Sequence, residues 1–249
     1  MKAIRGIAIN NEVHTARDLD LLLLRSESAA ENPAPRRLTE SIPGRNGLLD
    51  YSGYYDGVIF YDEREISYKF FCGGSPREVR EAADALKRWH GRKITVVEDD
   101  DPDYSVTGWA TVSEDERSPL GNYLYLTLKL DAEPFRIRLR PTVLQFPAIT
   151  GTSSYDVRNS VMPARLSVTV NSMSAGGGSS TPALLISTAS TQNSMLITTV
   201  GTAVTVDRFL LKGGAQRLIF ETGLLAGTDF HYYAAGAANV TVSFTEGKF

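Results

Sequence analysis

Alternation of hydrophobic and polar residues is the strongest pattern along the chain. In NYLYLTLKLD (residues 122–131), every second position from 124 to 130 is leucine, and polar or aromatic residues stand between the leucines. Side chains alternate between the two faces of a β-strand, so this pattern predicts a strand with one buried face. Similar runs bounded by Gly, Asp and Pro recur through the chain, for example FRIRLR (135–140), RLSVTVN (165–171) and NVTVSF (239–244). The sequence therefore predicts a protein that is mainly β.

One segment has helical periodicity instead, and it predicts an α-helix over residues 75–90. Ser75, Pro76 and Glu78 form the sequence of a capping box with proline in the first turn. Apolar residues then recur at helical spacing, at Val79, Ala82, Ala83, Leu86 and Trp89. Gly91 is suited to end the helix.

The composition changes near Pro147, which predicts two domains. Most of the 26 Lys and Arg residues and the 29 Asp and Glu residues precede Pro147, whereas the remainder is rich in Ser, Thr, Gly, Ala and Val. We expect a first domain over residues 1–143, which contains the helix, and a second over residues 144–249. The predicted fold class is mainly β, with two β-sandwich domains and one helix flanking the first.

Net charge and cysteine content exclude several classes of protein. The formal net charge of −3 argues against a general binder of nucleic acids or anionic membranes, which would carry a basic excess. The one cysteine, Cys72, permits no intramolecular disulfide and no zinc site built on cysteine pairs. The first residues lack the apolar stretch of a signal peptide, and the aliphatic run Leu21 to Leu24 is too short to span a bilayer. We therefore expect a soluble protein that folds in a cytoplasm.

None of the short motifs predicts an active site. The glycines in residues 44–47 are not followed by Gly-Lys-Ser/Thr, so they do not predict a nucleotide-binding loop. The acidic run EDDDPDY (98–104) lacks the spacing of an EF-hand and predicts a solvated turn between two strands. No nucleophile elbow is present, and His14, His90 and His231 have no spaced partner ligands. We therefore expect no enzymatic activity, no cofactor and no metal.

A basic strand face favours contact with another protein surface. Arg136, Arg138 and Arg140 lie on one side of the predicted strand 135–140. Three neighbouring cations require acidic partners, solvent or an anion. We expect the partner to be an acidic surface on a neighbouring domain or subunit.

The loop SIPGRNG (41–47) allows two interpretations. Gly44 and Gly47 permit positive φ, and Pro43 favours a turn. The simpler interpretation is a tight turn before a strand. The alternative is a rigid loop that presents Arg45 and Asn46 to a partner.

The order of these features resembles the distal tail protein family of long-tailed, non-contractile bacteriophages. The resemblance covers most of the chain and rests on IPGRNGLLDYS (42–52), ALKRWHGRK (85–93), ITVVEDDDPDYSVTGWATV (94–112), FLLKGGAQRLIFETG (209–223) and NVTVSFTEGKF (239–249). The chain departs from the family pattern at GGAQR (213–217), where Gly-x-Asn is usual.

The resemblance implies a structural virion protein of the phage tail tip or baseplate, which acts in host adsorption. Six copies would form a ring through their N-terminal domains, and the C-terminal domain would be a galectin-like β-sandwich outside the ring. The ring would join the tail tube protein to tail-tip, tail-associated and receptor-binding proteins. Genome DNA would pass through without sequence-specific recognition. Assembly would take place in the cytoplasm of the host bacterium, without a membrane partner.

A ring of identical subunits requires two unlike, complementary surfaces on each copy. The charged first domain offers a basic strand face and an acidic turn, and Arg and Tyr are favoured at interface hot spots. The candidate inter-subunit contacts are Gly44, Arg45, Gly47, Tyr51, Tyr54, Tyr55, Arg136, Arg138 and Arg140.

The alternative function is a carbohydrate-binding β-sandwich module of a phage adhesion device. Such a module needs aromatic residues along one concave face, and the second half offers Tyr155, Phe209, Phe220, Phe230, Tyr232 and Tyr233. Only residues 230–233 form a cluster in sequence. A glycosidase would need two paired carboxylates, and the acidic residues Asp207, Glu221 and Asp229 show no such pairing.

Overall fold

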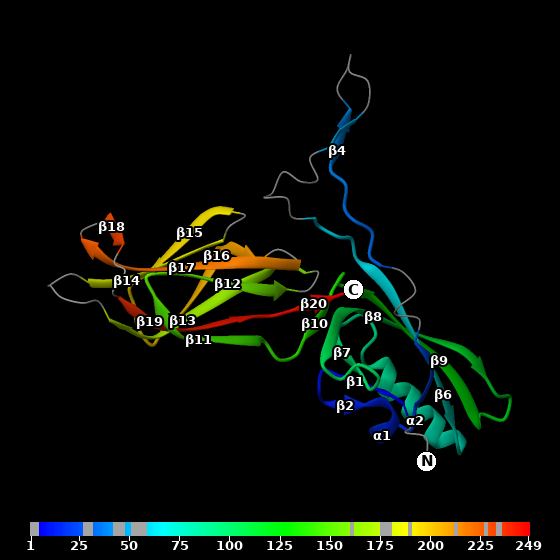
Figure 1. Cartoon of the computed structure of the whole chain (residues 1–249). Helices are drawn as coiled ribbons and strands as arrows, with labels where there is room; N and C mark the ends of the chain where they lie inside the picture. Colours follow the sequence, from blue (N-terminus) through cyan, green and yellow to red (C-terminus); the bar gives the residue numbers. More distant parts are fainter. Residues whose placement is uncertain are drawn as a thin grey trace. The chain divides into compact units, whose positions relative to one another are not determined.

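The computed structural model in Figure 1 divides the chain into two compact units, residues 1–139 with Phe249, and residues 140–248. It describes residues 5–26, 32–41, 48–50, 59–159, 162–174, 181–188, 191–211, 214–226, 229–232 and 236–249. The second unit begins a few residues before the predicted boundary at 143/144. Strand β11 (Thr142–Thr150) already pairs with β19 (Ala237–Phe244) from Thr142 onward, ahead of the change in composition.

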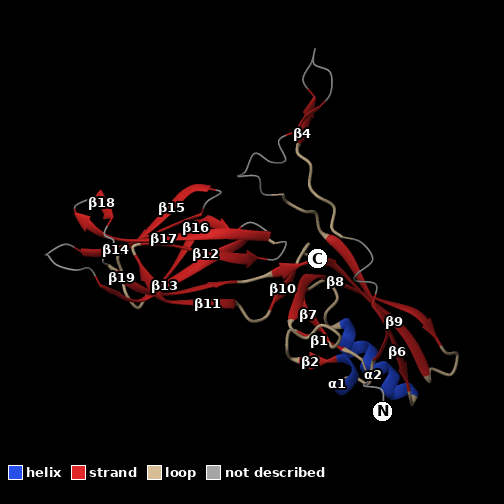
Figure 2. Cartoon of the chain, viewed as in Figure 1, coloured by secondary structure: helices blue, strands red, loops and turns tan. Residues whose placement is uncertain are grey.

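The first unit is built on one antiparallel sheet with strand order β2-β1-β7-β8-β9-β6-β3, and β10 pairs with β8. The strands are β1 (Ile7–Ile9), β2 (Val13–His14), β3 (Leu22–Ser26), β6 (Arg64–Gly73), β7 (Lys93–Glu98), β8 (Tyr104–Arg117), β9 (Tyr123–Ala132) and β10 (Arg136–Arg138). A separate two-stranded ribbon pairs β4 (Thr39–Ser41) with β5 (Leu48–Asp50). The helices, blue in Figure 2, both belong to this unit.

The sheet of the first unit curls around its own hydrophobic core. Strands β6 and β9 pair from Arg64↔Ala132 to Gly73↔Tyr123, and every second residue along β9 faces inward. The leucines from 124 to 130 that were predicted to form one face are all fully buried. At the edges of the sheet, the N–H of Leu23 donates to the carbonyl of Arg5 at 3.3 Å, so β3 approaches the segment before β1.

Helix α2 (Pro76–Lys87) forms where the sequence predicted a helix, and it packs into this core. The Ser75 Oγ accepts the N–H of Glu78 at 3.3 Å, and the Glu78 carboxylate accepts the N–H of Ser75 at 2.8 Å, which completes the capping box. The buried face of the helix consists of Val79, Ala82, Ala83 and Leu86. The chain leaves the helix through Gly91, whose φ is 73°.

A second, short helix, α1 (Thr15–Asp18), was not predicted. Its N-cap is His14, whose Nδ1 accepts the N–H of Arg17 at 3.2 Å. Because α1 is a single turn, it leaves no helical periodicity in the sequence.

The second unit is a sandwich of two antiparallel sheets. One sheet has the order β11-β19-β13-β16, and the other has the order β12-β17-β14-β15, with β18 paired to β17. The further strands of these sheets are β12 (Thr152–Asn159), β13 (Ala164–Ser174), β14 (Thr181–Thr188), β15 (Thr191–Ile197), β16 (Ala203–Leu211), β17 (Gly214–Ala226) and β18 (Asp229–Tyr232). The two-residue strand β20 (Gly247–Lys248) belongs to neither of these two sheets. One hydrophobic core takes residues from both sheets, for example Val240 and Phe220. The predicted mainly β fold class is therefore confirmed.

Candidate subunit interface

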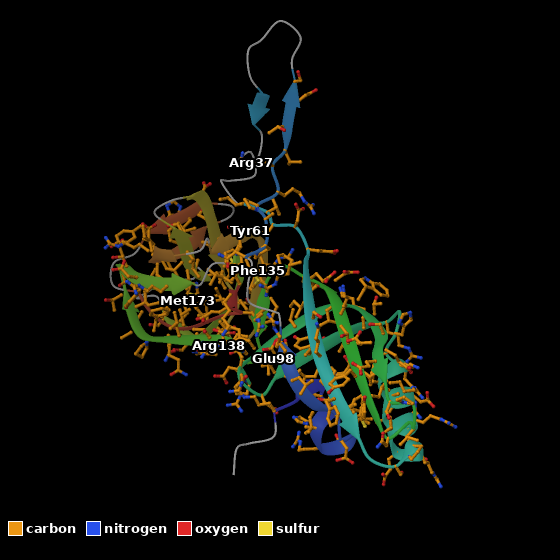
Figure 3. The ribbon with its side chains drawn as sticks, turned by 90° about the vertical axis from the view of Figure 1, so that its right-hand side faces the viewer. Arg37, Tyr61, Glu98, Phe135, Arg138 and Met173 are labelled. Carbon is orange, nitrogen blue, oxygen red and sulfur yellow. The ribbon has the colours of Figure 1, made fainter. Side chains whose placement is uncertain are left out.

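An extended arm leaves the sheet of the first unit between β3 and β6 (Figures 1 and 3). We call the described residues 34–41, 48–50 and 59–62 the arm. Near the sheet, Pro35 and Tyr61 form an isolated bridge, and further along β4 pairs with β5. All residues from 34 to 41 are exposed, so the segment that leads into and includes β4 lies in solvent.

The arm presents apolar side chains to solvent. Leu38, Ile59 and Phe60 are 44%, 50% and 48% exposed. A two-stranded ribbon is only marginally stable alone in water, and exposed apolar side chains on such an edge favour association with another chain. The arm is therefore a part of the first unit that is suited to contact a partner.

The arm also carries two adjacent cations with different surroundings. The Arg36 Nε donates to Asp62 Oδ1 at 2.8 Å. Arg37, labelled in Figure 3, has no ion-pair partner among the described residues. Successive side chains on an extended segment point to opposite faces, so Arg36 and Arg37 lie on different faces of the arm.

Six of the residues predicted as inter-subunit contacts belong to the same stretch of chain. Gly44, Arg45 and Gly47 fall between β4 and β5, and Tyr51, Tyr54 and Tyr55 follow β5. All six lie outside the described residues, so their role as contacts stays a prediction. Sequence reasoning missed the exposed Leu38 of the arm, because PAPRRL (33–38) has neither a strand nor a helix period.

An aromatic cluster anchors the base of the arm. The rings of Tyr61 and Phe135, both labelled in Figure 3, meet edge to face with their centroids 5.5 Å apart. The ring centroid of Phe249 lies 4.8 Å from that of Tyr61 and 5.3 Å from that of Phe135. Each such pair contributes about 0.5–1.5 kcal/mol beyond burial of its area. The last residue of the chain therefore helps to fix the position at which the arm begins.

The predicted basic strand face is arranged differently from the expectation. Arg136 is only 8% exposed, whereas Leu139, which alternation places on the opposite face of the predicted strand, is 46% exposed. Strand β10 ends at Arg138, so Arg140 does not belong to it. The reason is that Arg136 points inward to acidic partners of its own unit.

Those partners are Glu98, the last residue of β7, and Asp101, in the turn between β7 and β8. The Arg136 Nη2 lies 2.9 Å from Glu98 Oε1, and its Nη1 lies 3.3 Å from Asp101 Oδ2. Tyr68 on β6 also donates its hydroxyl to Glu98 Oε1 at 2.9 Å. The predicted hairpin turn is present, but these carboxylates hold the sheet together from within instead of being simply solvated.

Burial sets the protonation behaviour of this cluster. Burial, and then the charge of Glu98, raise the pKa of Tyr68 well above its ordinary value. Burial acts to lower the pKa of Arg136, but the charge of Glu98 and its hydrogen bond outweigh burial, so that pKa is raised. Burial, and then the charge of Arg136, lower the pKa of Arg64. The Nε and Nη2 of Arg64 are buried without a hydrogen-bond partner.

The buried side chain of Arg136 leaves little surface for a neighbouring subunit. Arg138 is partly buried and Arg140 is exposed. The role of these three arginines as inter-subunit contacts stays a prediction, and Arg140 offers the most accessible side chain.

The aromatic residues considered for sugar binding mostly serve the core of the second unit. Tyr155 and Phe220 pack with Phe146, with ring centroids 4.5 and 5.2 Å from it. The ring of Phe230 covers Gly223, where a Cβ atom would lie 2.3 Å from the ring. Tyr232 is 53% exposed. The described aromatic side chains thus provide one exposed ring at this site.

Neither a metal-ligand cluster nor a membrane span is found in the described part of the chain. No three His, Cys, Asp or Glu side chains there converge as metal ligands would. No helix there is long and apolar enough to cross a membrane.

No protein-family model and no curated protein matches the chain. Among solved structures, the fold is that of a phage hub protein. One solved structure with this fold is the crystal structure of the SPP1 Dit protein (gp 19.1), described as a paradigm of the hub adsorption apparatus in phages that infect Gram-positive bacteria. The two chains share 13% sequence identity with a TM-score of 0.56, over 99% of this chain and 100% of the SPP1 protein. At this identity the likeness establishes a common fold, and the resemblance expected from the sequence is confirmed at that level.

Proposed function

We propose that this protein is a structural component of a bacteriophage tail, a distal tail protein that acts as a hub for host adsorption. The observation that carries the proposal is the fold shared with the SPP1 hub protein over 99% of the chain. A similarity that covers both units along the whole chain favours a common architecture over a single borrowed module. The exposed arm of the first unit supports the proposal, because a hub subunit must bind its neighbours.

The hub we propose is a ring of six copies. Head-to-tail contacts between unlike surfaces close into a ring when the rotation between neighbours is right. The first unit supplies the ring contacts, and the second unit, a galectin-like sandwich, lies outside the ring. The ring joins the tail tube protein to tail-tip, tail-associated and receptor-binding proteins, and genome DNA passes through it.

The role we propose is structural rather than enzymatic. The protein is assembled in the host cytoplasm and resides in the virion. Specific adsorption then depends on the proteins that the ring carries.

The test is negative-stain imaging of the purified chain at high concentration. We expect ring-shaped particles with six-fold symmetry. A control variant with three arm substitutions, Leu38→Ser, Ile59→Ser and Phe60→Ser, should give single subunits, because it removes the exposed apolar side chains without touching either core. Wild-type fields that contain only single subunits at every concentration refute the proposal.

A further inference from the structure

An open hollow of about 530 Å³ lies in the first unit where α1, β3, β6 and α2 meet. Its apolar lining consists of Ala16, Leu19, Leu22, Phe71 and Ala82. Carboxylates also line it, from Asp18, Asp20, Glu78 and Glu81, and none of the described residues of the lining is basic. This volume lies within the range of pockets that bind ligands, so the hollow can receive side chains of another chain.

Most of these carboxylates have no cationic partner in the described part of the chain. Asp18 accepts the N–H of His14, and Glu78 accepts the N–H of Ser75. Glu81 pairs with Arg77, but both side chains are largely exposed. Besides burial, the charges of Asp20 and Glu78 raise the pKa of the Cys72 thiol, as expected where negative charge gathers. The hollow therefore attracts a cation attached to an apolar surface.

The arm offers this combination of groups. By alternation along its two paired segments, Arg37 and Ile59 fall on the same face as Pro35 and Tyr61, the residues of the bridge. Arg37 has no ion-pair partner among the described residues, and Ile59 is half exposed. A cation beside an aliphatic side chain is complementary to the hollow in both charge and polarity.

The arm and the hollow lie at opposite ends of strand β6. The arm joins the sheet near Arg64, where β6 begins, and the hollow contacts Phe71, Cys72 and Gly73, where β6 ends. At about 3.3 Å per residue, these sites are about 25 Å apart. Figure 1 shows the arm leaving the sheet at the end remote from α1 and α2. The arm is thus placed to reach another copy rather than its own hollow.

We propose that the hollow receives the arm of a second copy of this chain, with Arg37 facing the carboxylates and Ile59 facing the apolar lining. This inference rests on the proposed assembly of copies into a ring and identifies the two surfaces that join. Each copy then carries one donor surface, the arm, and one acceptor surface, the hollow. Such a contact is head-to-tail, which is the type that a ring requires.

The test compares an acceptor variant and a donor variant, each with a matched control. The acceptor variant, Asp20→Asn with Glu81→Lys, changes the charge of the hollow. Its control, Asp84→Lys, changes an exposed charge on α2 that does not line the hollow. The donor variant is Arg37→Glu with Ile59→Ser, and its control is Glu40→Gln on the other face of the arm. We expect association to weaken at least tenfold in each variant and less than twofold in each control, as measured by sedimentation. Unchanged thermal unfolding at a concentration where wild type is dissociated shows that each variant is folded.

Mixing the two variants gives the sharper result. The donor variant keeps an intact hollow, and the acceptor variant keeps an intact arm, so a mixture should form a dimer with one copy of each and no larger species. Assembly of the acceptor variant at the wild-type level overturns the inference and leaves the proposed ring standing, with another surface as the acceptor. If the hollow instead binds a basic segment of a different protein, the inference is likewise overturned and the proposed ring still stands. A wild-type chain that never associates overturns both the inference and the proposed function.

Discussion

Replacement of Arg136 by methionine should destabilise the first unit strongly. The side chains of Arg136 and Glu98 are only 10% and 12% exposed, and their charged atoms are 2.9 Å apart. Removal of one partner from a buried ion pair leaves the other charge uncompensated, at a cost of about 3–5 kcal/mol. The surface pair Lys129–Glu65, with side chains 48% and 58% exposed, should contribute less than about 1 kcal/mol. We therefore expect Arg136→Met to cost about 3 kcal/mol and Lys129→Met less than 1 kcal/mol.

Arg64 provides a matched control within the same cluster. Its Nε and Nη2 are buried without a hydrogen-bond partner. The positive charge of Arg136 further disfavours the charged form of Arg64. Removal of a buried donor that makes no hydrogen bond relieves a desolvation cost. Arg64→Met should therefore be neutral or stabilising, although the chemical change is the same as in Arg136→Met.

Urea unfolding followed by tryptophan fluorescence measures these effects in the right unit. Both tryptophans of the chain, Trp89 and Trp109, belong to the first unit, so their emission is insensitive to unfolding of the second. With a slope of about 2 kcal/mol per molar urea, a loss of 3 kcal/mol lowers the midpoint by about 1.5 M. Equal midpoints for Arg136→Met and Lys129→Met would refute the role given to the buried ion pair.

Three further variants test other parts of the first unit by the same unfolding measurement. The pKa of Tyr68 is raised in the folded state, so as pH rises the Tyr68 hydroxyl ionises in the unfolded chain before it does so in the folded chain. The contribution of Tyr68 to the free energy of unfolding is therefore complete below about pH 10 and falls by about 1.4 kcal/mol per pH unit above it. Tyr68→Phe should remove that alkaline loss, and an unchanged pH profile would contradict it. Ser75→Ala should cost about 1 kcal/mol through loss of the α2 cap, and no change in the midpoint would show that the capping box is dispensable. Gly108→Ala should cost about 1–3 kcal/mol, because a Cβ atom there would lie 2.6 Å from the carbonyl oxygen of Asp131. A wild-type urea midpoint for this variant would show that β8 and β9 can move apart at this position without loss of stability.

Local patterns in the sequence predicted the elements whose stability is local. Helix α2 was predicted because its cap, its apolar period and its terminal glycine all lie within one short segment. The buried face of β9 followed from the alternation of leucine. These features need no knowledge of distant parts of the chain.

Features that depend on distant residues were missed or misread. The inward direction of Arg136 depends on Glu98 and Asp101, which precede it by 38 and 35 residues and become neighbours only when β10 pairs with β8. Alternation alone defines two faces of a strand but does not decide which of them is buried. The sequence did not indicate that Leu38, Ile59 and Phe60 of the arm are exposed, because exposure is a property of the folded chain.

The most direct measurement is the mass of the purified chain by sedimentation over a wide range of concentration. A hub of six 27.2 kDa subunits predicts one limiting species of about 163 kDa, reached without a stable dimer, because a dimer with an open arm and an open hollow continues to add subunits. A chain that remains at 27.2 kDa throughout, or that stops at a two-fold dimer, would contradict assembly through unlike surfaces.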